Sequence, residues 1–413
     1  MTNQRNTAFG LTHRLARFLL QNKPFIVVWL ALFVSMAGIA MVSPLLSVFA
    51  EEFGASGIWL GLAFSGFALS QIPLMPIVGR LSDRFGKRTF LWLGLLIYAI
   101  AAVGYFWAPG YKELVFFRII SGAGTAMVIP TAYAYVGELA PRGHEGRYMG
   151  LFNIAMIAGF GIGPMLGGII HDSLGMDATF VSMGVLSIIG FFIALFFLPV
   201  RNPAPVEKKH SELSTPFTSM IKDNTMRGII AVQFVLGLSA GTVLTFLGIF
   251  MTSRLETSLA LVGVAMSIRY LQNGILAYPF GWLADRVNRV VLVSMGLLVM
   301  AAGTLSISWI GNFALLVGVF VIIGTFESMA TPSINAITVD KGRVLGMGSV
   351  MGIINTASSV GLVIGSLGGG AIENSFGVEW VFRYAAAFAF AGIILFNVFM
   401  RISAVKSRQM TTQ

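Results

Sequence analysis

Twelve apolar stretches constrain the fold of this chain more than any other feature. Each is about 20 residues long, which is the length that a helix needs to cross a hydrocarbon core of about 30 Å. Only 11% of the residues are charged, whereas a soluble domain has about a quarter. The predicted spans are 24–50, 57–79, 90–108, 114–136, 148–171, 177–199, 227–252, 258–281, 290–310, 312–336, 346–371 and 378–400. The chain is therefore predicted to be an all-α polytopic membrane protein.

A sequence repeat divides the twelve spans into two sets of six. The segment GFGIGPMLGGIIHDSLG (159–175) aligns with GLVIGSLGGGAIENSFG (361–377) at a shift of 202 residues, and eight of the 17 positions are identical. Pro130 matches Pro332 at the same shift. Two parallel six-helix repeats with a binding site between them near mid-membrane are a known transporter architecture. We therefore expect two pseudo-symmetric six-helix bundles.

Polar segments flank and join the predicted bundles, which cover residues 24–199 and 227–400. Residues 1–23 are basic with apolar residues interleaved, a pattern typical of an amphipathic segment at a membrane surface. A short apolar core followed by a small-residue cleavage site is not evident, so a signal peptide is not predicted. Residues 200–226 are rich in Pro, Lys and Ser, as in a linker, and residues 401–413 form a polar tail.

Positive charge is distributed unequally between the two predicted membrane faces. Of the 27 Lys and Arg, only Lys112 and Arg254 lie in the loops of one face, and three more lie within spans. The other 22 lie at the face that carries both termini. This imbalance follows the positive-inside rule. We expect both termini in the cytoplasm and a plasma membrane location, such as the bacterial inner membrane. The net charge of +10 then reflects topology, not nucleic-acid binding.

A charged segment, GRLSDRFGKRT (79–89), lies between the second and third predicted spans, and a weaker copy, GWLADRVNR (281–289), lies 202 residues later. We expect both to be short polar hairpins at the cytoplasmic face. A carboxylate such as Asp83 is favoured near a helix N-terminus and near basic side chains. The residues predicted to form a cytoplasmic gate are Gly79, Asp83, Arg84, Gly86, Lys87, Arg88, Asp285 and Arg286.

Four charged side chains lie about one helical turn or more inside predicted spans, namely Arg118, Arg269, Glu327 and Arg383. Glu327 is the sole carboxylate at membrane depth, which favours a role in proton or cation coupling over a purely structural ion pair. Counted along the helices, the depths of Arg269 and Glu327 differ by roughly 6 Å, which two long side chains can bridge. Arg383 lies near a span end and is predicted to be structural.

Further polar residues lie next to these charges. Gln272 and Asn273 follow Arg269 on one helix face. The predicted proton-coupling residues are Glu327 and Arg269, and the candidate substrate-binding residues are Arg118, Arg269, Gln272, Asn273 and Glu327.

The segment 79–89 matches the loop motif between spans two and three of the major facilitator superfamily. The chain resembles that superfamily over essentially its whole length. The resemblance implies the major facilitator fold, in which two six-helix bundles alternate in access. It also implies that segment 79–89 is a latch, with Asp83 facing the start of span eleven when the cytoplasmic side is closed. The alternative is that its basic residues only enforce topology.

Span five carries a second motif, with members Gly150, Gly159, Gly163, Pro164, Gly167 and Gly168. It resembles the motif of twelve-span drug:proton antiporters. Glycines at such spacings allow close helix approach, and proline bends a helix. The resemblance implies that this span keeps the halves sealed during exchange, and small-residue packing is the alternative. The second repeat has Ser366 in place of Pro164.

A third, partial match is VFFRIISGAGTAMVIP (115–130), which resembles the superfamily's span-four motif centred on an arginine, here Arg118. Ser121 stands where glutamine is common. The resemblance implies that Arg118 handles substrate or protons. A structural hydrogen-bonding role is the alternative.

The sequence indicates that this protein is not an enzyme. Its histidines, which are His13, His144, His171 and His210, lie in loops or at span ends, so no metal site is predicted in mid-membrane. No phosphate-binding loop is present, and no cofactor is expected. We expect a secondary active transporter that exports lipophilic or cationic drugs in exchange for protons and works as a monomer in the lipid bilayer. The alternatives are a proton-coupled carrier of an anionic metabolite, sugar or lipid head group, held by Arg118 and Arg269, and a receptor or scaffold that transports nothing.

Overall fold

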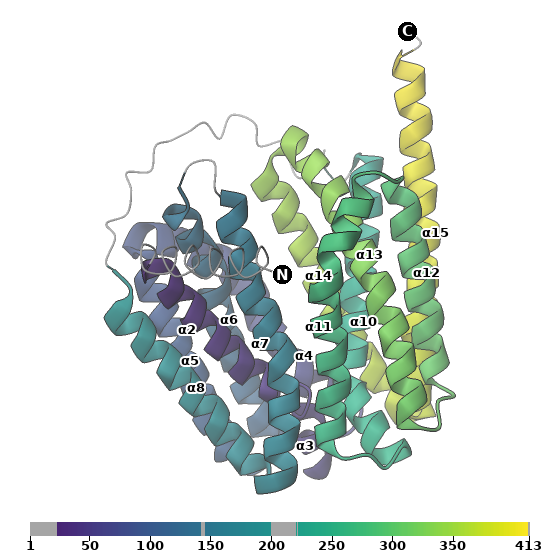
Figure 1. The fold of residues 1–413 in the computed structure, drawn as a ribbon. Helices are drawn as coiled ribbons and strands as arrows, with labels where there is room; N and C mark the ends of the chain where they lie inside the picture. The colour runs from purple at the N-terminus through teal and green to yellow at the C-terminus, as the bar shows by residue number, and fades with distance from the viewer. Residues whose placement is uncertain (1–22, 142–144, 200–219, 221, 412–413) are drawn as a thin grey trace, which may run out of the picture.

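The computed structural model describes residues 23–141, 145–199, 220 and 222–411. Within them, twelve helical spans are long and apolar enough to cross a membrane, and they form two bundles (Figure 1). The predicted twelve-helix fold is confirmed. Residues 1–22 of the predicted amphipathic segment 1–23 and most of the predicted linker 200–226 lie outside the described residues.

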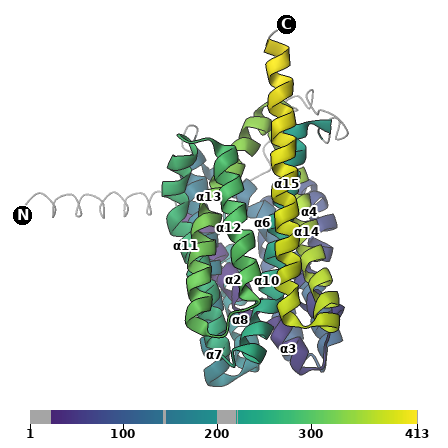
Figure 2. The ribbon, with the colours of Figure 1, turned by 90° about the vertical axis from the view of Figure 1, so that its right-hand side faces the viewer.

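The helices of the two halves follow one another in the same order. The first half contains α2 (Lys23–Val42), α3 (Leu46–Glu52), α4 (Ile58–Phe85), α5 (Lys87–Phe106), α6 (Tyr111–Leu139), α7 (Glu145–Leu174) and α8 (Met176–Phe197). The second half contains α10 (Asn224–Arg254), α11 (Leu259–Ala284), α12 (Arg289–Ile307), α13 (Phe313–Leu345), α14 (Met347–Phe376) and α15 (Val378–Thr411). Helix α15 therefore continues past residue 400, and its last turns project beyond the bundle (Figure 2).

Two names are used below for the ends of the molecule. The terminal face is the end at which α2 begins and α15 ends, and the opposite face is the other end (Figure 1).

The first span is interrupted, although the sequence predicted one continuous helix over 24–50. Helix α2 ends at Val42 and α3 begins at Leu46. Pro44 lies in the turn between them, where its ring and missing N–H prevent a continuous helix. The turn brings Ser43 to the end of α2, and its hydroxyl donates a hydrogen bond of 2.8 Å to the Ile39 carbonyl.

The charged segment 79–89 is helical on both sides of a single residue, which corrects the predicted polar hairpin. Helix α4 runs through Phe85, so Asp83 and Arg84 lie on its last turn, and α5 begins at Lys87. Only Gly86 separates the two helices, with φ at +94°. Glycine adopts this conformation without the steric cost that a Cβ would impose. The motif glycine is thus explained by a one-residue connection.

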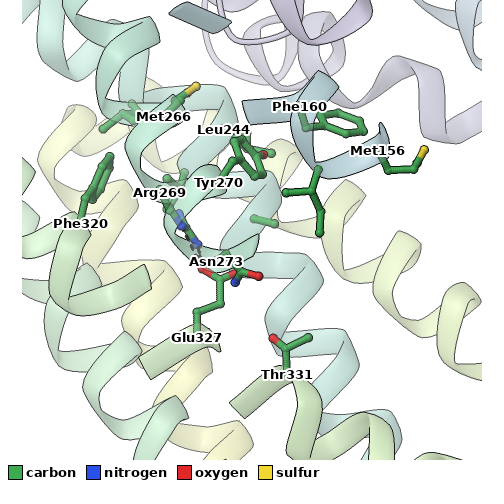
Figure 3. A pocket seen from close by; sticks show the side chains of 14 residues that line it. Met156, Phe160, Leu244, Met266, Arg269, Tyr270, Asn273, Phe320, Glu327 and Thr331 are labelled. Carbon is green, nitrogen blue, oxygen red and sulfur yellow. Dashed lines mark hydrogen bonds and ion pairs between the residues drawn. The ribbon is translucent and has the colours of Figure 1, made fainter. Parts of the chain in front are cut away.

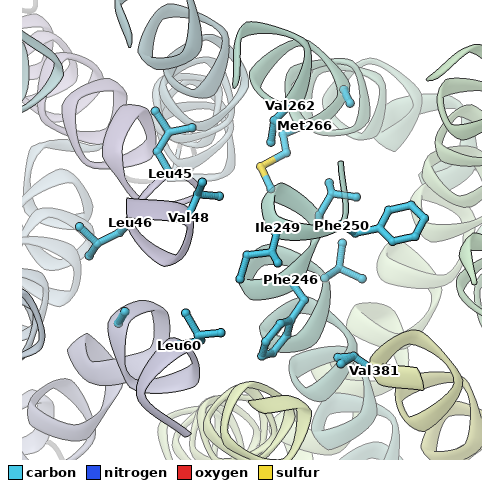
Figure 4. Packing of buried hydrophobic residues seen from close by; sticks show 14 of the residues in the cluster. Leu45, Leu46, Val48, Leu60, Phe246, Ile249, Phe250, Val262, Met266 and Val381 are labelled. Carbon is cyan, nitrogen blue, oxygen red and sulfur yellow. The ribbon is translucent and has the colours of Figure 1, made fainter. Parts of the chain in front are cut away.

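A cluster of buried apolar side chains joins the halves toward the opposite face. Leu45, Leu46 and Val48 of the first half pack in the same cluster as Phe246 and Ile249 of α10 (Figure 4). All five are at most 5% exposed. Close-packed apolar side chains leave no room for water, so this cluster seals the molecule between the halves.

Close backbone contacts extend the seal along α4, α7, α11 and α14. One glycine on each helix lies so near the other half that a Cβ would clash with a carbonyl oxygen. The distances from such a Cβ are 2.5 Å for Gly61 to Ser366, 2.3 Å for Gly168 to Leu259, 2.1 Å for Gly263 to Pro164 and 2.2 Å for Gly370 to Gly57. These four glycines are two pairs at the 202-residue shift, and we call them the seal glycines.

The same four helices are free of such contacts near the terminal face. Gly79, Gly150, Gly281 and Gly352 also form two pairs at the 202-residue shift, and a Cβ on any of them would meet no atom of the described residues within 4 Å. In the part of the chain that the structure describes, the close glycine contacts between the halves therefore lie toward the opposite face, and these four positions near the terminal face are open.

Candidate functional site

A cavity of about 270 Å³ lies between the two halves, lined by α7 of the first half and by α10, α11 and α13 of the second. Arg269 of α11 and Glu327 of α13 point toward each other in its wall (Figure 3). Arg269 Nε and Nη2 donate to Glu327 Oε2 at 3.0 and 2.9 Å. The two side chains are 13% and 24% exposed. The sequence thus correctly predicted that these residues are within reach of each other.

The two amides that follow Arg269 point in different directions. Asn273 lines the cavity. Gln272 instead packs against α13, where its Nε2 donates to the Val321 carbonyl at 2.8 Å and to Thr325 Oγ1 at 2.6 Å. Gln272 is not among the residues that line the cavity, so the structure separates it from the other predicted substrate-binding residues.

Aromatic side chains form much of the cavity wall and were not singled out by the sequence. Phe160 of α7 and Tyr270 of α11 come from different halves, and their ring centroids are 6.1 Å apart. Met156 and Leu244 lie nearby (Figure 3). The chain has 34 Phe and 21 Met, so residue type alone carried no signal for these positions.

Arg118 lines a second cavity of about 220 Å³ on the first-half side. Its side chain is only 3% exposed. Nε donates to the Phe64 carbonyl at 3.0 Å and Nη2 donates to Ser43 Oγ at 3.1 Å. The guanidinium also lies 4.9 Å from the centroid of the Phe67 ring. The two cavities share four lining residues, Phe160, Leu244, Met266 and Tyr270.

Three of the predicted gate residues, Asp83, Lys87 and Asp285, belong to ion-pair chains, of which each half has one. In the first half, Lys87 contacts Asp83 at 3.2 Å and also pairs with Glu138 at the end of α6. The corresponding groups in the second half are Arg289, Asp285 at 3.5 Å and Asp340 at 2.7 Å. Each member matches its counterpart at the 202-residue shift, and each chain connects the second, third and fourth spans of its own half.

None of these contacts crosses between the halves. Within the described residues, the ion pair of Asp83 is with Lys87 alone, and the Asp83 side chain is 60% exposed. Arg84 lies over the Phe85 ring, Arg286 lies over the Trp282 ring, and Arg88 donates to the Leu195 carbonyl. In the part of the chain that the structure describes, Asp83 has no ion pair with α14, the helix that corresponds to span eleven.

The glycine motif of span five contacts two different helices. Gly159, Gly163 and Gly167 face α2, where a Cβ on each would lie within 2.7 Å of Met36, Ala37 or Met41. Pro164 and Gly168 face α11 of the other half, as described for the seal glycines. Gly150 faces open space at the other end of the helix. Packing within the first half and sealing between the halves are thus properties of different members of the motif.

Comparison with known proteins places these observations in a family. The model of the Major Facilitator Superfamily matches residues 28–250 and 229–410. An uncharacterized MFS-type transporter of Methanocaldococcus jannaschii is 27% identical over 380 residues, covering 90% of this chain and 97% of the relative. Multidrug resistance protein MdtG of Proteus mirabilis is 26% identical over 380 residues, covering 89% of this chain and 93% of the relative. A solved bacterial homologue of the human lysosomal transporter Spinster, inward-facing and unoccupied, has a TM-score of 0.78 at 13% identity and covers 91% of this chain and 96% of its own.

Proposed function

Because the chain belongs to the Major Facilitator Superfamily, whose members are transporters and not enzymes, we propose that it exports lipophilic or cationic drugs and similar small molecules in exchange for protons. The observation that carries this proposal is the Arg269–Glu327 ion pair in the wall of a cavity between the halves. The similarity to a multidrug resistance protein supports the class of cargo. The expected partners are the cargo, protons and the lipid bilayer.

The ion pair offers a simple basis for exchange. A proton on Glu327 neutralises the carboxylate and leaves Arg269 without its counter-charge, whereas a cationic cargo needs the ionised carboxylate. Proton and cation therefore compete for the same group. The aromatic and methionine side chains around the pair suit apolar cargo of varied shape.

The open terminal face supports a direction of loading. The distribution of Lys and Arg predicts that this face is cytoplasmic, so the cavity would receive cargo from the cytoplasm. The proposed location is the plasma membrane, such as the bacterial inner membrane. We propose that the segment 79–89 latches this face in the alternate state. Each protein molecule carries its own cavity, the segment 79–89 at the terminal face and the seal glycines toward the opposite face. This arrangement is consistent with a functional monomer.

The proposal is tested with purified protein in liposomes that carry a pH gradient and take up ethidium, a lipophilic cation. Wild-type protein should accumulate ethidium against its gradient. Glu327→Gln should still bind ethidium through the apolar walls of the cavity but more weakly than wild-type protein, lose the pH dependence of binding and fail to accumulate it. Glu379→Gln is the matched control, because Glu379 pairs with Arg254 at 2.9 Å outside the cavity. Uphill transport that survives in Glu327→Gln would show that the coupling carboxylate lies elsewhere. A fluorescent reporter fused after Gln413 tests the orientation.

A further inference from the structure

We propose that Arg118 is a second subsite of the cargo cavity and binds an anionic group, of the carboxylate or sulfonate type, on a lipophilic cargo. This inference rests on the proposed export function and adds to its cargo lipophilic molecules that carry an anionic group. It starts from the difference between the two buried arginines.

Arg118 is a buried cation without a counter-charge. An arginine stays ionised in proteins, and a buried charge is costly unless it is paired. Within the described residues no carboxylate contacts Arg118, which has only the neutral Phe64 carbonyl and the Ser43 hydroxyl as acceptors. Nη1 has no acceptor among the described residues. Because Arg118 lines the second cavity, an anion that enters the cavity can supply the counter-charge and the hydrogen-bond acceptor that the described residues do not supply.

The surroundings of Arg118 favour an anion that binds in the plane of the guanidinium. The Phe67 and Phe64 ring centroids lie 4.9 and 5.7 Å from Arg118 Cζ. Cation–π contacts of this kind stabilise the charge but do not accept hydrogen bonds from its N–H groups in the way that an anion does. The free donors lie at the edge of the guanidinium, where a planar fork matches the two oxygens of a carboxylate.

Arg269 does not compete for this role, because Glu327 already accepts two of its hydrogen bonds. The residues that line the second cavity include polar groups such as Gln71, Ser121 and Thr125, but they include no carboxylate. Together the two cavities present two arginines and one carboxylate. One anionic group on the cargo therefore restores neutrality.

The shared walls indicate the shape of such a cargo. Phe160, Leu244, Met266 and Tyr270 line both cavities, so an apolar body lying against them can place its anionic end at Arg118. A zwitterion can place a cationic end at Glu327 as well. The favoured cargo is a lipophilic molecule with one such anionic group, with or without an amine.

The experiment compares three probes with one apolar body and different head groups, which are 4-butylbenzoate, 4-butylbenzamide and 4-butylbenzylamine. Dissociation constants are measured by calorimetry on the purified full chain in neutral detergent at pH 7.5. We expect wild-type protein to bind the benzoate at least about tenfold more tightly than the benzamide, as for a hydrogen-bonded charge pair. Arg118→Gln should remove this preference without changing the benzamide affinity. Arg118→Lys should retain part of it.

Arg383→Gln is the matched control, since Arg383 also contacts two aromatic rings, Trp309 and Trp380, but lines neither cavity. A preference that survives in Arg118→Gln and disappears in Arg269→Gln would overturn the proposal. The wild-type ranking is decisive even if Arg118→Gln does not fold, because tighter binding of the benzylamine, or equal or absent binding of all three probes, also overturns it. No proton gradient enters this measurement, so its failure is distinct from failure of the Glu327 test.

Discussion

Asp172 Oδ2 accepts a hydrogen bond of 3.0 Å from the backbone N–H of Ala260, so a carboxylate at the end of α7 caps the first turn of α11 in the other half. A related contact occurs in the second repeat, where Glu373 Oε2 near the end of α14 accepts from the backbone N–H of Gly57, just before α4, at 3.3 Å. Negative charge is stabilised at a helix N-terminus. The two carboxylates thus hold the opposite face closed from both sides.

We expect Asp172→Asn to weaken this closure. The lost charge–dipole interaction is about 0.3–1 kcal/mol, so the opposite face should open about two- to fivefold more often. The chain has no Cys, which makes Ile249→Cys in the buried cluster a unique reporter for a membrane-impermeant maleimide added from that face. Asp177→Asn, also near the opposite face, is the control. An unchanged labelling rate in Asp172→Asn would show that this carboxylate cap does not help to keep the opposite face closed.

We expect Gly263→Ala to open the same face by a steric route. A Cβ at Gly263 would lie 2.1 Å from the Pro164 carbonyl oxygen, which forces α7 and α11 apart. Overpacking of this kind costs about 1–3 kcal/mol, so labelling of Ile249→Cys should rise by about fivefold or more and transport should fall. Gly318→Ala on α13, where a Cβ meets nothing within 4 Å, should leave both unchanged. Equal labelling of the two variants would contradict the close contact.

Asp83→Asn should act on the other gate. The Asp83 side chain is 60% exposed here and pairs only with Lys87 among the described residues. The substitution should therefore change the stability of the open state little. If Asp83 contacts span eleven when the terminal face closes, the variant should favour the open state by about 1–3 kcal/mol, the usual size of a coupling energy. Turnover should fall, and Gly352→Cys at the open end of α14 should react faster. Normal turnover with unaltered labelling would refute the latch.

Asp223 should make the start of α10 sensitive to acid. Partial burial alone would raise the pKa of its carboxyl, but the ion pair with Lys341 at 2.7 Å and backbone N–H groups hold that pKa below its usual range. The folded-state value is therefore lower than the unfolded value of about 3.9. Its stabilising contribution is complete above that unfolded value and is lost as the pH falls through the folded value.

Asp223→Asn isolates this contribution, since asparagine also caps helices well. We expect a melting temperature lower by on the order of 1 °C at pH 7, and a smaller drop between pH 7 and pH 3 than in wild-type protein. Asp177→Asn, at a carboxylate without an ion-pair partner in the described part of the chain, is the comparison. Identical acid profiles for Asp223→Asn and wild-type protein would show that the ion pair with Lys341 contributes nothing.

The sequence predicted the features that depend on membrane depth and missed those that depend on rotation about a helix axis. Arg269 and Glu327 could be brought together by counting residues, because spans cross the same layer and depth converts directly into residue number. Gln272 and Asn273 differ by 100° around α11, and no count of depth says which of them faces the cavity. The carbonyl and hydroxyl that contact Arg118 come from α4 and from the turn after α2, and only packing reveals such partners. The shift of 202 residues between Gly61 and Gly263 is readable in the sequence, but whether a shared glycine touches the other half is not.

The seal glycines have a consequence for the rate at which the opposite face closes again. A gate closed by interlocking side chains must select one rotamer for each chain whenever it shuts, and each immobilised side chain costs conformational entropy. Glycine has no rotamers, so at these four points two smooth main-chain surfaces meet and part. Closure at these four points should then need no search among side-chain conformations, in contrast to closure of the buried cluster that contains Leu45 and Phe246.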